Sequence, residues 1–175
     1  MSDASALLVI DMQAGLVHGP QVPHNKAQLL DHVSYLITSA RAQQIPLFFA
    51  QHTGAAGSPI AAGSELWQIA PELPLLDSDR CFNKTRPSCF ADTPLLAWLQ
   101  NAGIKRLVIV GMKTEYCVDT TCRAAADRGF EVVLVSDAHS TTDNAVLTAE
   151  QIIAHHNATL SGPFVQLLTT QEIRF

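Results

Sequence analysis

The fold is decided by residues 106–135, which read RLVIVGMKTEYCVDTTCRAAADRGFEVVLV. Residues 106–110 open the stretch with one charged residue, Arg106, and four apolar, mostly β-branched residues, which is typical of a buried strand. It passes through Gly111 into a helical pattern that Gly129 ends, and a second apolar run follows at residues 131–135. A strand, a helix and a strand in this order predict a βαβ unit, and therefore a parallel sheet.

The same alternation continues on both sides of this unit. Strands are predicted at residues 6–10, at 47–50, in a short run before Lys84 and at 164–168, and helices at 26–42, 93–102 and 143–156. Residues 53–80 interrupt the alternation with glycines and prolines and form a long excursion. We expect one α/β domain over residues 1–175, a Rossmann-like three-layer sandwich with about six mostly parallel strands in the order 3-2-1-4-5-6.

The composition argues against several classes of partner. With 47% apolar and 15% charged residues the chain can bury a full core, and its net charge of −5 provides no basic surface for nucleic acid. No apolar run is long enough to span a bilayer, so we expect no membrane partner. The amino-terminal residues lack the pattern of an export signal and none of the four cysteines forms a C-x-x-C pair, which predicts reduced thiols and a cytoplasmic location.

Three reactive side chains are predicted at the carboxyl ends of strands. Asp11 comes directly after the first strand, Lys84 after the short third strand, and Cys117 just beyond the fourth. Ligands bind at this edge of a doubly wound sheet, where the strand order reverses. Each residue alone has a structural explanation, as a turn cap, a solvated charge or a small buried side chain. Together they would place an acid, a base and a thiol in one crevice.

The surroundings of Cys117 favour a nucleophilic role. The residue lies in the first turn of its predicted helix, where unpaired backbone N–H groups favour an anion, and a nearby Lys84 ammonium acts in the same direction. We therefore expect a lowered pKa for the Cys117 thiol, with Asp11 as the proton acceptor. The same N–H groups can bind the oxyanion of a tetrahedral intermediate. A thiolate, a base and an oxyanion site indicate acyl transfer.

Three segments form a joint pattern along the chain: LVIDMQ at residues 8–13, Lys84 ahead of Phe90, and GMKTEYCV at residues 111–118. In their order and spacing they resemble the isochorismatase-like cysteine hydrolases, a superfamily that includes nicotinamidases and N-carbamoylsarcosine amidohydrolase. The resemblance covers nearly the whole chain, and the G-x-x-T-x-x-C-V segment is its most specific part.

The resemblance implies a catalytic triad of Asp11, Lys84 and Cys117 on the Rossmann-like sheet. It also implies a cis peptide bond between Met112 and Lys113, with the backbone N–H groups of Lys113 and Cys117 as the oxyanion hole. A small-molecule amide substrate, the lack of a cofactor, and assembly as a homodimer or homotetramer are further implications. The low content of charged residues agrees with a buried subunit interface.

The substrate pocket is predicted from a small set of polar and aromatic residues: Gln13, His52, Trp67, Phe90 and Tyr116. Nicotinamidases of the family carry a D-x-H metal signature after the second strand, where this chain reads Gln51-His52-Thr53, so we predict no metal site. Lys113 stands where relatives have small residues and would bring a charge near the pocket mouth. His139 is either a pocket residue or a hydrogen-bonded loop histidine.

The retained Cys117 favours hydrolysis of a C–N bond, because isochorismatase proper lacks this cysteine and cleaves a vinyl ether. We therefore predict a cysteine hydrolase that acts on a small amide or ureido compound through a thioester. Two alternatives stay open at this point. One is a metal-dependent nicotinamidase, and the other is a non-enzymatic thiol sensor or assembly module.

Overall fold

The computed structural model describes residues 4–175 and contains one six-stranded sheet in the order β3-β2-β1-β4-β5-β6. Every neighbouring pair of strands is parallel, so the predicted order is confirmed and the sheet is parallel throughout. The strands are β1 (Ser5–Ile10), β2 (Leu47–His52), β3 (Arg80–Lys84), β4 (Arg106–Met112), β5 (Glu131–Ser140) and β6 (Gln166–Leu168).

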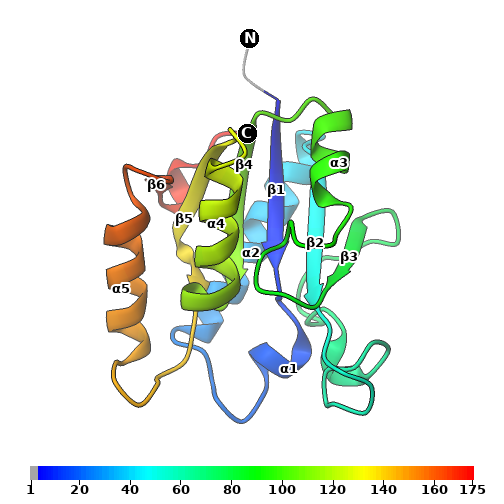
Figure 1. Ribbon diagram of the computed structural model, residues 1–175, viewed down its shortest axis with the longest axis vertical. Coiled ribbons are helices and arrows are strands. Elements are labelled where there is room, and N and C mark those ends of the chain that lie inside the picture. The colour runs from blue at the N-terminus through cyan, green and yellow to red at the C-terminus, as the bar shows by residue number, and fades with distance from the viewer. Residues whose placement is uncertain (1–3) are drawn as a thin grey trace.

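Helices cover both faces of the sheet and complete the predicted three layers (Figure 1). The long helix α2 (Lys26–Ala42) lies behind the sheet, while α3 (Leu95–Asn101) and α4 (Asp119–Ala126) lie in front of it, with α5 (Ala149–Leu160) packed beside α4. The remaining helical segments are short: α1 (Ala14–Val17), η1 (Glu65–Trp67), η2 (Thr114–Val118) and η3 (Thr170–Glu172).

The core consists of two apolar clusters, one on each face of the sheet. Alternate residues of β1 point to opposite faces, so Leu7 and Val9 pack in the cluster that includes α2, whereas Leu8 and Ile10 pack in the other. All six residues of β1 are buried, as expected for a central parallel strand that helices cover on both sides.

Gly111 lies where β4 pairs with β1 and leaves no room for a side chain. It pairs with Ile10 across the β1–β4 ladder, and its φ of 120° lies in a region that residues with a side chain rarely adopt. A Cβ atom at this position would lie 2.1 Å from the carbonyl oxygen of Ile10. The glycine therefore draws the end of β4 against the residue that precedes Asp11.

Several predicted boundaries were wrong, and the strand expected at residues 131–135 extends to Ser140 as β5. The helix expected at residues 143–156 begins at Ala149, because Thr148 caps it and forms a capping box with Gln151. The last strand covers only residues 166–168 instead of 164–168. The helix expected after β4 is also divided, since the wider turn η2 precedes α4.

The excursion at residues 53–80 packs against the loop that follows β1. Ile69 forms an antiparallel bridge with Gln13, and the indole Nε1 of Trp67 donates a hydrogen bond to Thr53 Oγ1 at 2.9 Å. Within residues 4–175, no helix combines the length and the apolar character that a membrane-crossing segment needs.

Candidate active site

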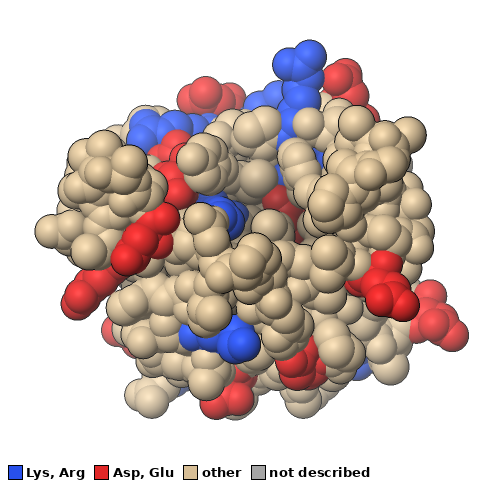
Figure 2. Space-filling view, turned by 90° about the horizontal axis from the view of Figure 1, so that it is seen from below, with Lys and Arg blue, Asp and Glu red and all other residues tan. Residues whose placement is uncertain are grey.

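Three strand ends converge at the lower edge of the sheet in Figure 1. Asp11 directly follows β1, Lys84 is the last residue of β3, and Cys117 lies in η2 just after β4. Parallel strands end at the same edge, which Figure 2 shows from below, and this face is hollowed near its middle. Basic and acidic atoms are both visible inside the hollow (Figure 2). The strand order therefore places Asp11, Lys84 and Cys117 at one edge of the sheet, as predicted.

The Lys84 ammonium lies between the other two groups. Its Nζ donates a hydrogen bond to Asp11 Oδ2 at 2.7 Å and another to Cys117 Sγ at 3.1 Å. All three residues are buried, with exposed fractions of 2% for Lys84, 1% for Asp11 and 9% for Cys117. The second carboxylate oxygen, Asp11 Oδ1, is also buried and is within normal hydrogen-bond distance of no donor among residues 4–175, although the Asp11 carboxyl and the Cys117 thiol are close enough to influence each other's pKa through a side-chain hydrogen bond. Asp11 Oδ1 is therefore free to accept a proton.

Burial sets the protonation of the three groups. It raises the pKa of Asp11 above its ordinary value, although the Lys84 ammonium opposes this rise. Burial is the largest single influence on Lys84 and lowers its pKa, but the Asp11 carboxylate, Cys89 and Cys117 together outweigh it, so the pKa of Lys84 is raised. Lys84 is therefore charged near neutral pH.

The expected lowering of the Cys117 pKa was wrong. Burial raises the pKa of this thiol to about 12, and the Asp11 carboxylate adds to the rise while Lys84 opposes it. The helix end and Lys84 favour the thiolate, but the burial of the sulfur, which the sequence does not reveal, outweighs them. Cys117 is therefore a thiol at rest and needs a base before it can attack.

A short turn presents Cys117 to this group. The peptide bond between Met112 and Lys113 is cis, and the backbone N–H groups of Tyr116 and Val118 both donate to the Lys113 carbonyl oxygen. Two hydrogen bonds on one carbonyl hold the turn in a fixed shape around the sulfur.

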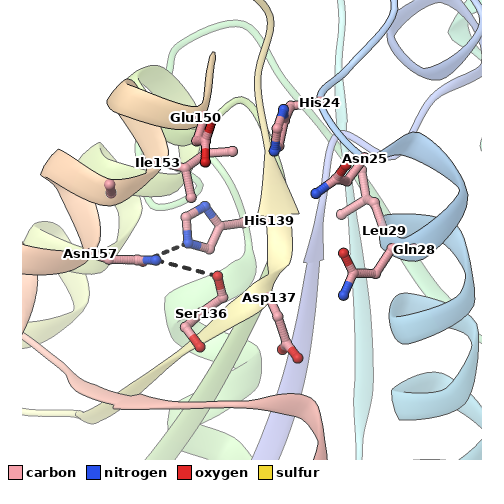
Figure 3. A pocket seen from close by; sticks show the side chains of 11 residues that line it. His24, Asn25, Gln28, Leu29, Ser136, Asp137, His139, Glu150, Ile153 and Asn157 are labelled. Atoms are coloured by element: carbon pink, nitrogen blue, oxygen red, sulfur yellow. Dashed lines mark hydrogen bonds between the residues drawn. The ribbon is translucent and has the colours of Figure 1, made fainter. Parts of the chain in front are cut away.

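Behind the turn, a buried hydrogen-bond chain links η2 to α5. The hydroxyl of Thr114 lies 2.9 Å from His139 Nδ1, and His139 Nε2 lies 2.8 Å from Asn157 Oδ1. Asn157 also donates to the carbonyl oxygen of Ser136 (Figure 3). Burial lowers the pKa of His139 to about 4, so the ring is neutral near neutral pH. His139 thus supports the turn and does not line the cavity that contains Cys117.

A cavity of about 250 Å³ opens beside Cys117. Asp11 and Cys117 line it together with Leu16, His52, Ile60, Pro87, Lys113 and Tyr116. His52 and Tyr116 are therefore where the sequence predicts pocket residues. The volume is below the range of about 300–1,000 Å³ that is typical of sites for drug-sized ligands, which indicates a small ligand.

Three other predicted pocket residues do not line this cavity. Gln13 is fully buried, and its amide bonds to the backbone N–H and carbonyl of His52 and to the Trp67 carbonyl, so it braces the loops. The Trp67 indole is held by Thr53. Phe90 belongs to the apolar core and stacks on Phe130 with ring centroids 6.1 Å apart.

Leu16, Ile60 and Pro87 line the cavity but were missed by sequence reasoning. Leu16 lies in α1 just after Asp11, and Pro87 follows Lys84 by three residues, so proximity to the triad could have suggested both. Ile60 comes from the excursion at residues 53–80, and no sequence pattern indicates which residue of that segment turns inward.

Comparison with known proteins decides the family. An isochorismatase domain matches residues 5–172 of the chain. The chain belongs to the isochorismatase family of hydrolases. A family relative, a secreted isochorismatase effector of Verticillium dahliae, is 31% identical over 170 residues, which cover 97% of this chain and 90% of the effector.

Two further similar proteins agree with this chain, one in sequence and one in both sequence and fold. A streptothricin hydrolase of Streptomyces noursei is 35% identical over 138 residues, which cover 79% of this chain but only 50% of that hydrolase. A crystal structure of an isochorismatase family protein is 35% identical, with 95% of this chain and 98% of that chain covered and a TM-score of 0.89. The match over nearly the whole of both chains confirms the fold and the family.

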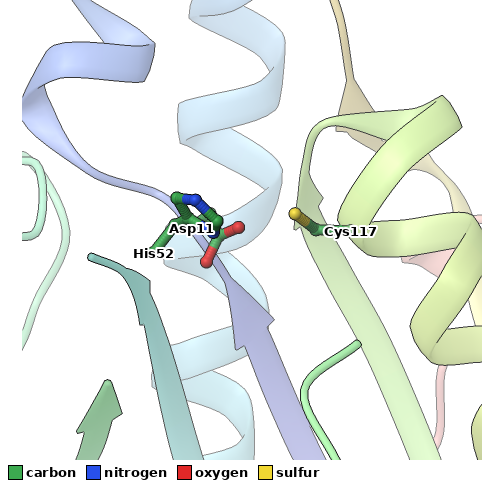
Figure 4. A group of neighbouring side chains, drawn as sticks. All are labelled: Asp11, His52 and Cys117. Carbon is green, nitrogen blue, oxygen red and sulfur yellow. The ribbon is translucent and has the colours of Figure 1, made fainter. Parts of the chain in front are cut away.

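The sequence leaves open a metal-dependent nicotinamidase, which would need a metal site near Cys117. Asp11, His52 and Cys117 offer three ligand atoms that lie within 4.8 Å of one another (Figure 4). The Lys84 ammonium lies 3.4 Å from His52 Nδ1, in addition to its contacts with Asp11 and Cys117. A divalent ion held by this group would face that ammonium at close range, and the two positive charges would repel each other. The three residues therefore do not fit a metal.

Proposed function

We propose that this family member is a cysteine hydrolase that cleaves the C–N bond of a small amide or ureido compound, with Cys117 as the nucleophile. The observation that supports this proposal is the contact of one buried ammonium with both the acid and the thiol beside a small cavity. A nucleophile within hydrogen-bond reach of the groups that control its proton is the arrangement that covalent catalysis requires.

The first step forms a covalent bond to Cys117. Asp11 Oδ1 takes the thiol proton while Sγ bonds to the carbonyl carbon, and the electrons of the carbonyl π bond move to the oxygen. The carboxylate is suited to this transfer, because its raised pKa lies closer to that of the groups with which it exchanges a proton. The Lys84 ammonium stabilises the negative charge while it passes from Asp11 to the sulfur and then to the oxygen.

The second step releases the amine and leaves a thioester. The oxyanion re-forms the carbonyl, the C–N bond breaks, and the nitrogen takes the proton from Asp11 and departs as ammonia or an amine. Water then adds to the thioester carbon while Asp11 accepts its proton, the C–S bond breaks, and that proton returns to the sulfur. The balance is one amide and one water consumed, and one acid and one amine produced.

The oxyanion would be held by the backbone N–H groups of Lys113 and Cys117. Both residues border the cavity, and the hydrogen bonds to the Lys113 carbonyl fix the turn between them. Donors that are fixed in advance stabilise a developing charge without further reorganisation.

The alternatives from the sequence are less well supported. A metal-dependent nicotinamidase would need a metal site, which the Lys84 ammonium disfavours. A thiol sensor would need an accessible thiolate, whereas Cys117 is 9% exposed and burial raises its pKa to about 12. A small-molecule partner, a homodimer or homotetramer, and a cytoplasmic location stay predictions.

The proposal is tested by ammonia release from a panel of small primary amides and ureido acids. Wild type should release ammonia from at least one compound, and Cys117→Ala should abolish the release with the fold retained by circular dichroism. Cys81→Ala is the matched control, because Cys81 is an exposed free thiol on β3. Turnover by Cys117→Ala at the wild-type rate would refute the proposal.

A further inference from the structure

Lys113 is the cavity residue that the proposed mechanism uses only through its backbone. It follows the cis bond after Met112, and it lines the same cavity as Asp11 and Cys117. Because Tyr116 and Val118 both bond to its carbonyl oxygen, the backbone of Lys113 is fixed at the cavity wall. Its side chain, on a flexible four-carbon stem, is the mobile part of the residue.

The ammonium of Lys113 has no acidic partner. Its Nζ donates a hydrogen bond to the hydroxyl of Thr142 at 3.1 Å, and none of the ion pairs within residues 4–175 includes Lys113. Lys84 differs sharply, since its ammonium lies 2.7 Å from the Asp11 carboxylate. Thr142 lies outside the cavity that Lys113 and Cys117 line, and its neutral hydroxyl binds the ammonium without neutralising it. The flexible stem allows the ammonium to move from Thr142 into the cavity.

The charges around the cavity therefore do not cancel. The negative charge of Asp11 is matched by Lys84, and burial keeps the Cys117 thiol neutral by raising its pKa. Burial, followed by the nearby Lys84 ammonium, lowers the pKa of His52, so this ring is also neutral near neutral pH. Lys113 is left as the one unmatched charge among the lining residues that the structure describes.

We propose that the Lys113 ammonium selects amide substrates that carry a carboxylate, such as the monoamide of a dicarboxylic acid. This inference rests on the proposed function, because it names the substrate class of the same cavity. Apolar side chains of Leu16, Ile60 and Pro87 would contact the carbon chain of the substrate. The amide would lie at Cys117 and the carboxylate at Lys113, and the cavity of about 250 Å³ suits a short chain.

The test compares matched substrates that differ in the charged end. Succinamate and glutaramate carry the carboxylate, and butyramide and valeramide replace it with a methyl group. Wild type should favour the acids by about 10- to 100-fold in kcat/KM, as expected for one hydrogen bond to a charged group. In Lys113→Met, kcat/KM for the acids should exceed that for the neutral amides by no more than about threefold, mainly because KM for the acids rises. Lys113→Arg should keep most of the wild-type preference for the acids. The preference should also weaken at high ionic strength.

Lys105→Met is the matched control. It removes the same charge from an exposed position just before β4, at the opposite edge of the sheet, and should leave the ratio unchanged. A wild-type preference for the neutral amides, or an acid-to-amide ratio that Lys113→Met does not change, would overturn the inference while leaving the proposed hydrolysis intact.

Binding separates the two proposals if no amide of the panel is hydrolysed. Titration calorimetry of Cys117→Ala with succinamate and butyramide measures recognition without turnover, alone and combined with Lys113→Met. Lys113-dependent binding of succinamate, about tenfold or more tighter than that of butyramide, would support anion selection even if the hydrolysis proposal failed. Equal Kd values for succinamate in the two backgrounds would overturn it.

Discussion

Replacement of Lys84 by methionine should destabilise the fold and abolish activity together. Lys84 Nζ lies 2.7 Å from Asp11 Oδ2, and the side chains of Lys84 and Asp11 are 0% and 1% exposed. Methionine keeps most of the side-chain length but removes the ammonium, which leaves an unpaired carboxylate in the interior. Removal of one partner from a buried pair costs about 3–5 kcal/mol. The cost is limited because burial already raises the pKa of Asp11, so the carboxyl group can take up a proton.

Urea unfolding at about pH 7 measures the loss for the Lys84→Met variant. The double variant Asp11→Asn, Lys84→Met removes both charges and should recover at least half of the lost free energy, because the unpaired charge is then absent. Arg86→Met is the control, since it breaks an exposed ion pair with Asp92 whose atoms lie 3.9 Å apart. That change should stay within about 0.5 kcal/mol of wild type.

Catalysis should fall by more than about 10³-fold in Lys84→Met, because a protonated Asp11 cannot accept the thiol proton and no cation stabilises the sulfur anion. Ammonia release at saturating substrate measures this loss. If Lys84→Met unfolded at the same urea concentration as wild type and retained full turnover, the buried pair would have neither role.

Two further substitutions test the support of the site. Gly111→Ala should lower the free energy of unfolding by more than about 3 kcal/mol, because the added Cβ would lie 2.1 Å from the Ile10 oxygen. Gly129→Ala is the control: its Cβ would meet no atom within 4 Å, so only the φ of 83° should cost about 1 kcal/mol. Equal losses in the two variants would contradict the close approach at Gly111. His139 should make the fold less stable as pH falls from about 6.5 toward 4, because burial lowers its pKa from 6.5 to about 4 and the unfolded chain binds a proton that the native chain excludes. Above about pH 6.5 both states are neutral and the contribution is fully present, and the loss below it is on the order of 3 kcal/mol. His139→Gln should lack this part of the pH dependence, and parallel stability curves for the two proteins would contradict it.

The sheet could be predicted from the sequence because its central strands are continuous apolar runs. Residues 107–110 and 6–10 are apolar and buried on both faces of the sheet, and Gly111 and Asp11 mark where the two runs end. The helix at residues 143–156 was misplaced because its start depends on the cap at Thr148, which competes with turn-forming residues just before it. The spacing of apolar residues alone cannot decide whether the helix begins at residue 143 or at Ala149.

The meeting of Asp11, Lys84 and Cys117 could be predicted because each residue lies at or shortly after the end of a strand, and topology alone brings strand ends together. The cavity wall depends instead on which side chains of irregular loops turn inward. Gln13 and Ile60 illustrate this difference, since the amide braces two loops and the apolar residue lines the site. The pKa of Cys117 was predicted in the wrong direction for a related reason, because burial is a property of the whole fold.

The acyl group on Cys117 is the most direct test of the account. Wild type is mixed with an excess of an amide that it hydrolyses, and the reaction is quenched in acid within milliseconds. The protein is then digested, and the masses of its peptides are measured by mass spectrometry. The account predicts that the peptide with Cys117 gains the mass of the acyl group and loses it on treatment with hydroxylamine. An acyl group found on another residue, while Cys117 stays unmodified at every quench time, would contradict it.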